Sequence, residues 1–161
     1  MRIAVVTVSD RSYNGFRADI TGPELIAFIS SNTKDIAEYH LISDDRDMIT
    51  AKLIELSDAG VELVLTCGGT GFAERDNTPE ATRSVIDKEA PGIMEYIRYK
   101  NYANNPNSYY SRGVAGIRGK TIIINLPGSP GGAKDSYQII MDYIRHPVDL
   151  AGGFIRDCKK A

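Results

Sequence analysis

The chain has 161 residues, of which 42% are hydrophobic and 25% charged, and these proportions are typical of a single globular domain over residues 1–161. Its formal net charge of -2 argues against nucleic acid as a partner, because nucleic-acid-binding domains carry clustered basic residues. The apolar run at residues 3–8 is too short for a signal peptide, and no segment reaches the roughly 20 apolar residues that span a membrane. We therefore expect a cytoplasmic protein without a membrane partner.

Apolar, β-branched runs alternate with helical patterns along the chain. In chain order, strands are predicted at residues 3–8, 36–42, 61–66 and 121–125, of which the second is the weakest. Helices are predicted at residues 21–31, at 44–58, from residue 78 onward and at 131–145. This alternation predicts the α/β class, with a mostly parallel sheet in a three-layer α/β/α arrangement. Segment 114–125 predicts a small hairpin, and residues 101–112 predict a surface loop.

The ends of the predicted helices carry recognisable capping residues. Hydroxyl caps are predicted at Thr21, Thr78 and Ser129, and proline directly follows the last two. Thr21 also has the capping-box spacing with Glu24. Gly60 is expected to end the helix at 44–58.

Polar residues follow three of the predicted strands. Ser9 and Asp10 come after the first strand, a glycine cluster at 68–71 follows the third, and residues 126–130 follow the last. Ligands of open parallel sheets bind beyond the carboxyl ends of the strands. These three segments therefore predict one shared binding site.

The glycine cluster Gly68-Gly69-Thr70-Gly71 suits an anion. Residues without a Cβ let the main chain approach a ligand, so that successive N–H groups can point at one phosphate, and the Thr70 hydroxyl can add a donor. A plain tight turn is the alternative interpretation. Neither better-known phosphate motif is present: no GxGxxG follows a strand, and Gly119-Lys120-Thr121 lacks the earlier glycine of a P-loop, because residue 114 is Val114.

A carboxylate beside a phosphate site repels the ligand unless a cation lies between them. Asp76, shortly after the glycine cluster, therefore predicts Mg²⁺, which binds one or two carboxylates together with phosphate oxygens. Asp44 is a second candidate ligand, although it stands where it could instead cap the helix at 44–58. Arg75 could neutralise phosphate charge or pair with a surface acid.

The remaining polar candidates have weaker patterns. Ser111 and Arg112, at the edge of the predicted loop, are possible donors to a ligand. Cys67 and Cys158 have no CxxC spacing, so neither a zinc site nor a disulfide is predicted, and Cys67 reads as a small buried residue rather than a nucleophile. His40 and His146 have no metal-ligand spacing and are expected to serve packing or the surface.

Three longer stretches resemble one known family. They are TVSDRSYNGFRADITGPEL near the start, GGTGFAERDNTPEAT in the middle and SRGVAGIRGKTIIINLPGSP towards the end. Together and in this order they are similar to the molybdopterin-binding family, which includes the bacterial Mog and MoaB proteins and the G domains of plant Cnx and gephyrin. The resemblance spans most of residues 3 to 135.

The resemblance implies one molybdopterin-binding domain that assembles as a homotrimer. It also implies Mg²⁺-dependent transfer of AMP from ATP to the terminal phosphate of molybdopterin, with pyrophosphate as the second product. The adenylylated product then serves molybdenum insertion by a MoeA-like insertase. By motif position, Asp44 and Asp76 are the implied catalytic and metal-binding acids. The implied substrate-binding residues are Ser9, Asp10, Gly68, Gly69, Thr70, Gly71, Ser111, Arg112, Pro127, Gly128 and Ser129.

The chain departs from the family pattern at two places. Ser43 stands where the family often has proline, and the loop NNPNSYYSR replaces a Thr-Pro-x-Ala-like segment. Two other functions use the same loops. A carrier or scaffold would bind molybdopterin without catalysis, and a flavodoxin-like module would hold flavin.

Overall fold

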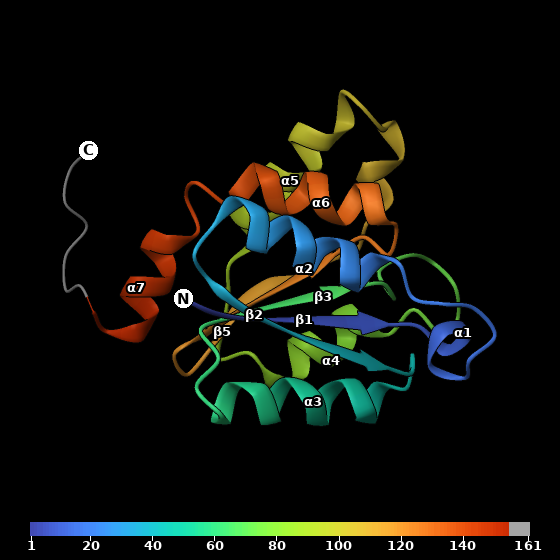
Figure 1. Cartoon of the computed structure of the whole chain (residues 1–161), viewed down its shortest axis with the longest axis horizontal. Coiled ribbons are helices and arrows are strands. Elements are labelled where there is room, and N and C mark those ends of the chain that lie inside the picture. Colours follow the sequence, from blue (N-terminus) through green and yellow to red (C-terminus); the bar gives the residue numbers. More distant parts are fainter. Residues whose placement is uncertain (155–161) are drawn as a thin grey trace.

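One six-stranded sheet with helices on both faces forms the body of the protein, as seen in a computed structural model that describes residues 1–154 (Figure 1). The strands are β1 (Arg2–Val8), β2 (Ile36–Ile42), β3 (Leu63–Cys67), β4 (Lys88–Glu89), β5 (Ala115–Arg118) and β6 (Thr121–Leu126). Their order in the sheet is β2-β1-β3-β6-β5-β4. Strands β2, β1, β3 and β6 are parallel to one another, and β5 lies antiparallel to both β6 and β4.

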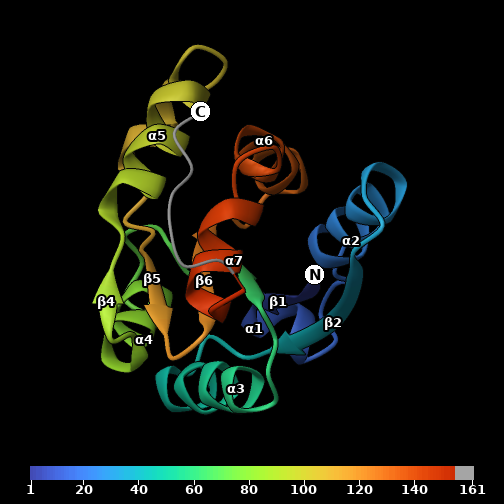
Figure 2. The ribbon, with the colours of Figure 1, turned by 90° about the vertical axis from the view of Figure 1, so that its left-hand side faces the viewer.

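Helices cover the two faces of the sheet unequally (Figure 2). The helices are α1 (Asp10–Tyr13), α2 (Thr21–Asn32), α3 (Arg46–Asp58), α4 (Thr78–Val85), α5 (Pro91–Tyr102), α6 (Pro130–Ile140) and α7 (Arg145–Gly152), with a 3-10 helix η1 (Pro106–Tyr110). One face packs against α3 and α4, and the other against α2, α5 and α6. No helix within residues 1–154 has the length and apolar character needed to cross a membrane.

The unbroken apolar runs of the parallel strands follow from this two-sided packing. In β1, Ile3 and Val5 pack into the core under α2 and α6, whereas Ala4 and Val6 pack into the core under α3. Side chains alternate between the faces of a strand, so a strand covered on both sides is apolar at every position. The predicted α/β class, the mostly parallel sheet and the hairpin of β5 and β6 are confirmed.

Several element boundaries differ from the prediction. The helix predicted at 131–145 ends at Ile140, and a turn leads into the separate helix α7, whose Val148 returns to the same core as Ile140. The loop predicted at 101–112 instead contains the end of α5 and the whole of η1. Helix α5 was not predicted, although its buried Met94 and Ile97 have helical spacing.

Two of the three predicted hydroxyl caps are wrong. The Asp19 carboxylate, not the Thr21 hydroxyl, accepts hydrogen bonds at the start of α2, and Thr21 Oγ1 instead donates to Gly128 O at 2.9 Å. Helix α4 has Asn77 at its N-cap, and the buried Thr78 Oγ1 has no hydrogen-bond partner within the described chain. Ser129 caps α6 as predicted.

Candidate functional site

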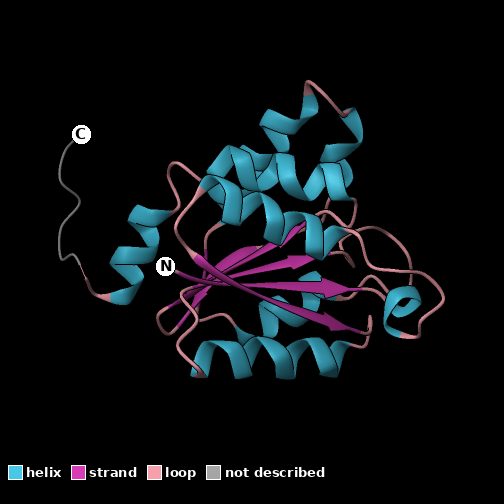
Figure 3. Cartoon of the chain, in the orientation of Figure 1, coloured by secondary structure: helices cyan, strands magenta, loops and turns pink. Residues whose placement is uncertain are grey.

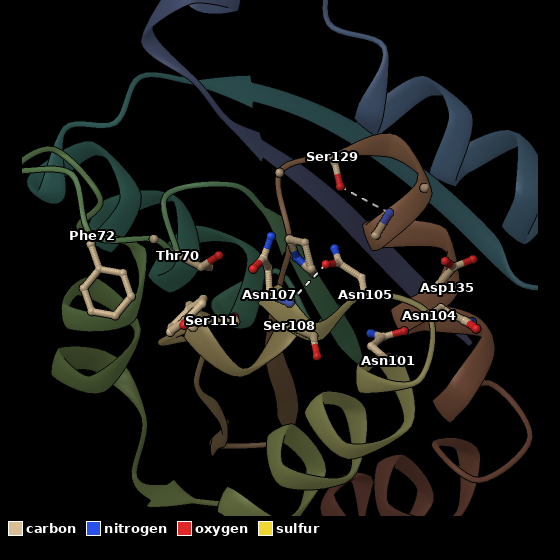
Figure 4. A pocket seen from close by; sticks show the side chains of 16 residues that line it. Thr70, Phe72, Asn101, Asn104, Asn105, Asn107, Ser108, Ser111, Ser129 and Asp135 are labelled. Carbon is tan, nitrogen blue, oxygen red and sulfur yellow. Dashed lines mark hydrogen bonds between the residues drawn. The ribbon is translucent and has the colours of Figure 1, made fainter.

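The loops after β1, β3 and β6 lie at the carboxyl edge of the sheet (Figure 3). Two neighbouring cavities, which share Gly128, are lined by residues of these loops. The first, here called the acidic cavity, is lined by Asp10, Asp19, Asp44 and Asp76 together with Gly68, Gly69 and Gly128. The second, here called the amide cavity, is lined by Asn101, Asn104, Asn105, Asn107, Ser111 and Asp135, with Thr70, Gly71 and Pro127–Ser129 (Figure 4). The predicted convergence of the three loops is therefore seen in the fold.

The wall between the cavities is made of bare main chain. Gly68 and Gly69 have positive φ values of 110° and 62°, a conformation that disfavours any residue with a Cβ. A Cβ on Gly68 would lie 2.4 Å from Val8 O, and one on Gly128 would lie 3.1 Å from Gly68 Cα. Gly128 lines both cavities, so ligands in the two cavities would meet across these glycines.

Main-chain donors of the glycine turn remain available to a ligand. The Gly68 N–H donates to Leu126 O at 3.2 Å and fixes the turn to β6. The N–H groups of Gly69, Thr70 and Gly71 donate to no protein acceptor within residues 1–154. Successive free amides of this kind form an anion-binding concavity.

Asp10 and Asp44 are joined by two hydrogen bonds, each from the main-chain N–H of one residue to the carboxylate of the other. The Asp10 N–H donates to Asp44 Oδ2 at 2.7 Å, and the Asp44 N–H donates to Asp10 Oδ1 at 3.0 Å. Ser43 Oγ also donates to Asp10 Oδ1, at 2.6 Å. The residue that departs from the family pattern thus supports the acid pair, and the ends of β1 and β2 are held together.

Arg75 pairs with Asp10, one of the residues that line the acidic cavity. Its Nε and Nη2 atoms both donate to the Asp10 carboxylate, the latter at 3.1 Å. The hydrogen bond from Arg75, supported by that from Ser43, lowers the pKa of Asp10 to about 2. Because the folded-state pKa is depressed, this stabilisation is present above 3.8 and is lost as the pH falls towards about 2.

Asp44 has the opposite electrostatic environment. Burial raises the pKa of its carboxyl group, and the nearby charges of Asp10 and Asp76 raise it further. No Lys, Arg or His side chain forms an ion pair with Asp44 in the described part of the chain. The helix cap of α3 is the neighbouring Asp45, which accepts from Met48 N at 2.9 Å, so Asp44 does not have the capping role considered for it.

Replacing Asp44 with asparagine is expected to stabilise the ligand-free protein at pH 7 by roughly 1 kcal/mol, or about 2–4 °C in Tm. A raised folded-state pKa means that the ionised carboxylate opposes folding as the pH rises through that pKa, and asparagine removes this opposition. The gain should vanish when urea unfolding is repeated below pH 3.8, the ordinary pKa of this carboxyl group, because Asp44 is then protonated in both the folded and the unfolded state. Asp142→Asn, at an exposed position, is the control, and equal behaviour of both variants would contradict the interpretation.

Arg112 braces the loop that carries Asp76. Its guanidinium donates to Gly71 O at 2.6 Å, to Asp76 O at 2.5 Å and to Glu80 Oε1 at 2.5 Å. The Asp76 carboxylate accepts from Ala73 N at 2.8 Å and lines the acidic cavity. Arg112 thus contacts the loop from behind, and its side chain does not line either of the two cavities.

Replacing Arg112 with methionine is expected to lower turnover by about tenfold to a hundredfold, because displacement of a binding loop by about 1 Å has effects of that size. Lysine should not rescue activity, since an ammonium group cannot make three bonds in a fixed plane. Hydrogen exchange of residues 69–77 should accelerate in both variants. Arg83→Met removes only a loose 3.8 Å contact with Glu89 and is the matched control; unchanged exchange in Arg112→Met would exclude the bracing role.

Oxygen donors dominate the acidic cavity, which fits a hard cation such as Mg²⁺. Within residues 1–154, no group of three His, Cys, Asp or Glu side chains is arranged to hold a metal by itself. A site built from one or two carboxylates, completed by phosphate oxygens and water, remains compatible with this arrangement. The half-buried Asp44 carboxylate, which lacks a cationic partner, fits such a site.

The other candidate residues have structural roles. Cys67 is fully buried at the end of β3, and burial raises the pKa of its thiol, which disfavours a nucleophile. Cys158 lies outside the described residues. His40 is half-buried on β2 and His146 is exposed on α7, and neither lines the two cavities.

Some cavity residues were not among the predicted site residues. Arg11, Arg17 and Asp19 line the acidic cavity, and four asparagines with Asp135 line the amide cavity. The asparagines fall in the segment read as a surface loop. Their unusual density over 101–107 was the available signal, because exposed loops rarely need so many amides at one place.

Comparison with known proteins identifies the family. Residues 4–146 match the model described as a probable molybdopterin binding domain. The chain is 38% identical to molybdopterin adenylyltransferase of Helicobacter pylori strain J99, covering 95% of this chain and 89% of that protein. It is 41% identical to the enzyme of the same name from Haemophilus influenzae, covering 88% and 74%. The crystal structure of the molybdopterin biosynthesis enzyme MoaB from Thermus thermophilus superposes with a TM-score of 0.88 at 41% identity, covering 94% and 96%. The chain therefore belongs to the molybdopterin-binding domain family.

Proposed function

We propose that this protein is a molybdopterin adenylyltransferase of molybdenum cofactor biosynthesis. It transfers AMP from ATP to the terminal phosphate of molybdopterin and releases pyrophosphate. The observation that carries the proposal is the pair of cavities that meet at Gly68 and Gly128, one acidic and one nearly neutral. Two substrates that react through their phosphates need such a junction, and relatives of the chain bear the name of this enzyme.

In this proposal, molybdopterin occupies the amide cavity and ATP the acidic cavity. A terminal phosphate oxygen of the pterin attacks the α-phosphorus of ATP, a new P–O bond forms, and the bond to pyrophosphate breaks with its electron pair. The free N–H groups of Gly69, Thr70 and Gly71 hold the phosphate at the junction. Ser9, Asp10 and Ser111 shape the cavity walls, and Pro127–Ser129 closes the junction from the β6 side.

Asp44 and Asp76 would hold Mg²⁺ in the acidic cavity. When bound, this ion supplies positive charge between the carboxylates and the ATP oxygens. The protein's own contribution is chiefly positioning, because phosphoryl-group chemistry needs little covalent participation by side chains. Arg11 and Arg17, which line the acidic cavity, are the second source of positive charge, and Arg75 adds a third guanidinium through its bond to Asp10.

Incubation of the purified chain with ATP, Mg²⁺ and molybdopterin tests the proposal. We expect stoichiometric appearance of adenylyl-molybdopterin and pyrophosphate. Molybdopterin binding without pyrophosphate release would support the carrier instead. A yellow protein with a flavin spectrum and no pterin binding would support the flavodoxin-like alternative.

We also propose that the chain is one molybdopterin-binding domain over residues 1–161 that acts in the cytoplasm as a homotrimer. Its coverage of 96% of the Thermus thermophilus protein supports a single domain. An exposed apolar groove between α5 and the start of α7, lined by Ile93, Tyr96, Tyr143 and Ile144, is a surface that assembly would cover. Light scattering coupled to gel filtration measures the assembly, and transfer of product to a MoeA-like insertase is the proposed next step.

A further inference from the structure

Asp135 is the only charged side chain among the 16 residues that line the amide cavity. All the other lining residues are amides, hydroxyls, glycines, proline or aromatic rings. The carboxylate of Asp135, an exposed residue, forms no hydrogen bond or ion pair within residues 1–154, whereas the preceding Lys134 pairs with Glu24 at 3.8 Å. A single unpaired carboxylate in an otherwise neutral cavity is an acceptor available to a ligand with two donors.

The position of Asp135 is fixed by the packing of its neighbours. Ser129 is the N-cap of helix α6, and its Oγ accepts from Gly132 N. Gly131, Gly132 and Asp135 of this helix line the amide cavity. The next residue, Ser136, is fully buried and accepts a hydrogen bond from the buried Asn101 Nδ2 at 2.9 Å. This hydrogen bond joins α6 to the end of α5, and it therefore fixes the position of Asp135 on α6.

Asp135 and Thr70 lie on opposite sides of the amide cavity. In Figure 4, Asp135 is on the side that carries Asn104, away from Thr70 and Phe72. The exposed ring of Phe72 lies edge-on to that of Tyr110, with the ring centroids 6.4 Å apart. A ligand with its phosphate at Thr70 would therefore direct its other end towards Asp135.

The pterin ring has an edge that suits this carboxylate. Its aminopyrimidinone half presents the N3–H and a 2-amino N–H side by side, and the two oxygens of a carboxylate can accept both in a bidentate arrangement. The side chains of Asn104 and Asn107 form no hydrogen bond within residues 1–154, so each offers one acceptor and two donors for the ring carbonyl and ring nitrogens. A cavity of about 380 Å³ is in the range that holds a small heterocycle.

We propose that Asp135 is the specificity-determining residue for the pterin ring and pairs with its N3–H and 2-amino group. This inference rests on the proposed function, because it places molybdopterin in the amide cavity. The pairing orients molybdopterin with its pterin ring at Asp135 and its phosphate at the glycine turn. Recognition then depends on the 2-amino group, which separates pterins from lumazines, whose ring carries an oxygen at that position.

Binding experiments on the full chain test this assignment. Dissociation constants for molybdopterin are measured by fluorescence, and those for pterin and lumazine by NMR titration, for wild type, Asp135→Asn and Asp142→Asn. The wild type should prefer pterin over lumazine by about tenfold or more, because each lost bond to a charged group has an effect of this size. Asp135→Asn should lose or invert this preference, since an amide offers one acceptor and one donor and thus matches lumazine. Its affinity for molybdopterin should fall by about tenfold to a hundredfold.

The outcomes separate this inference from the function on which it rests. Absence of molybdopterin binding by the wild type would overturn the proposed function itself. Wild-type binding with an unchanged pterin preference in Asp135→Asn would overturn the role of Asp135 and leave the function intact. An equal loss in the exposed control Asp142→Asn would show a general charge effect and also overturn the role. Matching thermal unfolding curves of the three proteins exclude misfolding as the cause.

Discussion

Replacement of Asp76 by asparagine should lower turnover by about 100-fold to 1000-fold while the protein stays folded. Loss of one well-placed electrostatic group at a reacting phosphate typically costs about 2.7–4 kcal/mol of barrier. The loop should keep its shape, because an asparagine side-chain oxygen can still accept from Ala73 N as Asp76 does. Arg112 binds the main-chain oxygen of residue 76, which the substitution does not change.

Pyrophosphate release measured across a range of Mg²⁺ concentrations gives the decisive readout. If Asp76 holds the cation, the variant should show two effects. Its maximal rate should fall, and it should need a higher Mg²⁺ concentration than the wild type for half-maximal activity. Glu74→Gln removes a carboxylate from the same loop, outside the acidic cavity, and should resemble the wild type. Wild-type turnover by Asp76→Asn would end the assignment of Asp76 to catalysis.

Substitution of Gly68 by alanine should have the largest effect on stability. Residue 68 has a φ of 110°, and the added methyl group would lie 2.4 Å from Val8 O, a main-chain atom at the end of strand β1. Backbone strain costs about 1–3 kcal/mol and an overpacked contact a similar amount, so the expected loss is about 2–5 kcal/mol. Any protein that still folds should also lose turnover, because the turn amides would move.

Two other glycines separate the contributions of strain and contact. Gly60 has a φ of 75° with open space around its Cβ position, so Gly60→Ala should show strain alone, about 1–2 kcal/mol. Gly131 has neither positive φ nor a close neighbour, and Gly131→Ala should stay within about 1 kcal/mol of the wild type. Urea unfolding of the three variants measures the series. Equal stabilities of Gly68→Ala and Gly60→Ala would contradict the close contact with Val8.

The sheet was predictable because both of its faces are covered. Apolar runs such as residues 61–66 have no other explanation in a chain of this composition, and they place the strand ends where the loops converge. The glycine turn was predictable for the same reason, because its residues directly follow a buried strand. Helix caps were less predictable: in the sequence ISDDRDM, adjacent Asp44 and Asp45 have equal capping potential, and only the direction of the chain at α3 distinguishes them.

Sequence patterns did not predict the contacts between residues that are far apart along the chain. Arg75 and Asp10 are 65 positions apart, and Arg112 is 36 positions from Asp76. Nothing in the local spacing indicates that the first arginine would pair with a residue of the acidic cavity and the second would support a loop. The amide cavity was missed because its asparagines fall in a segment that was predicted to be a surface loop, and only the fold brings them into one cavity with Asp135 of α6.

The bare-backbone wall at Gly68 and Gly128 has a consequence for how such an enzyme can evolve. Apart from segment 67–76 and Gly128, which contribute to both cavities, the acidic cavity is lined by residues from 7–44 and the amide cavity by residues from 101–135. Substitutions that alter the walls of one cavity therefore leave the walls of the other cavity unchanged. A mutant library confined to residues 101–110 should therefore yield enzymes with new acceptors and an inherited nucleotide preference.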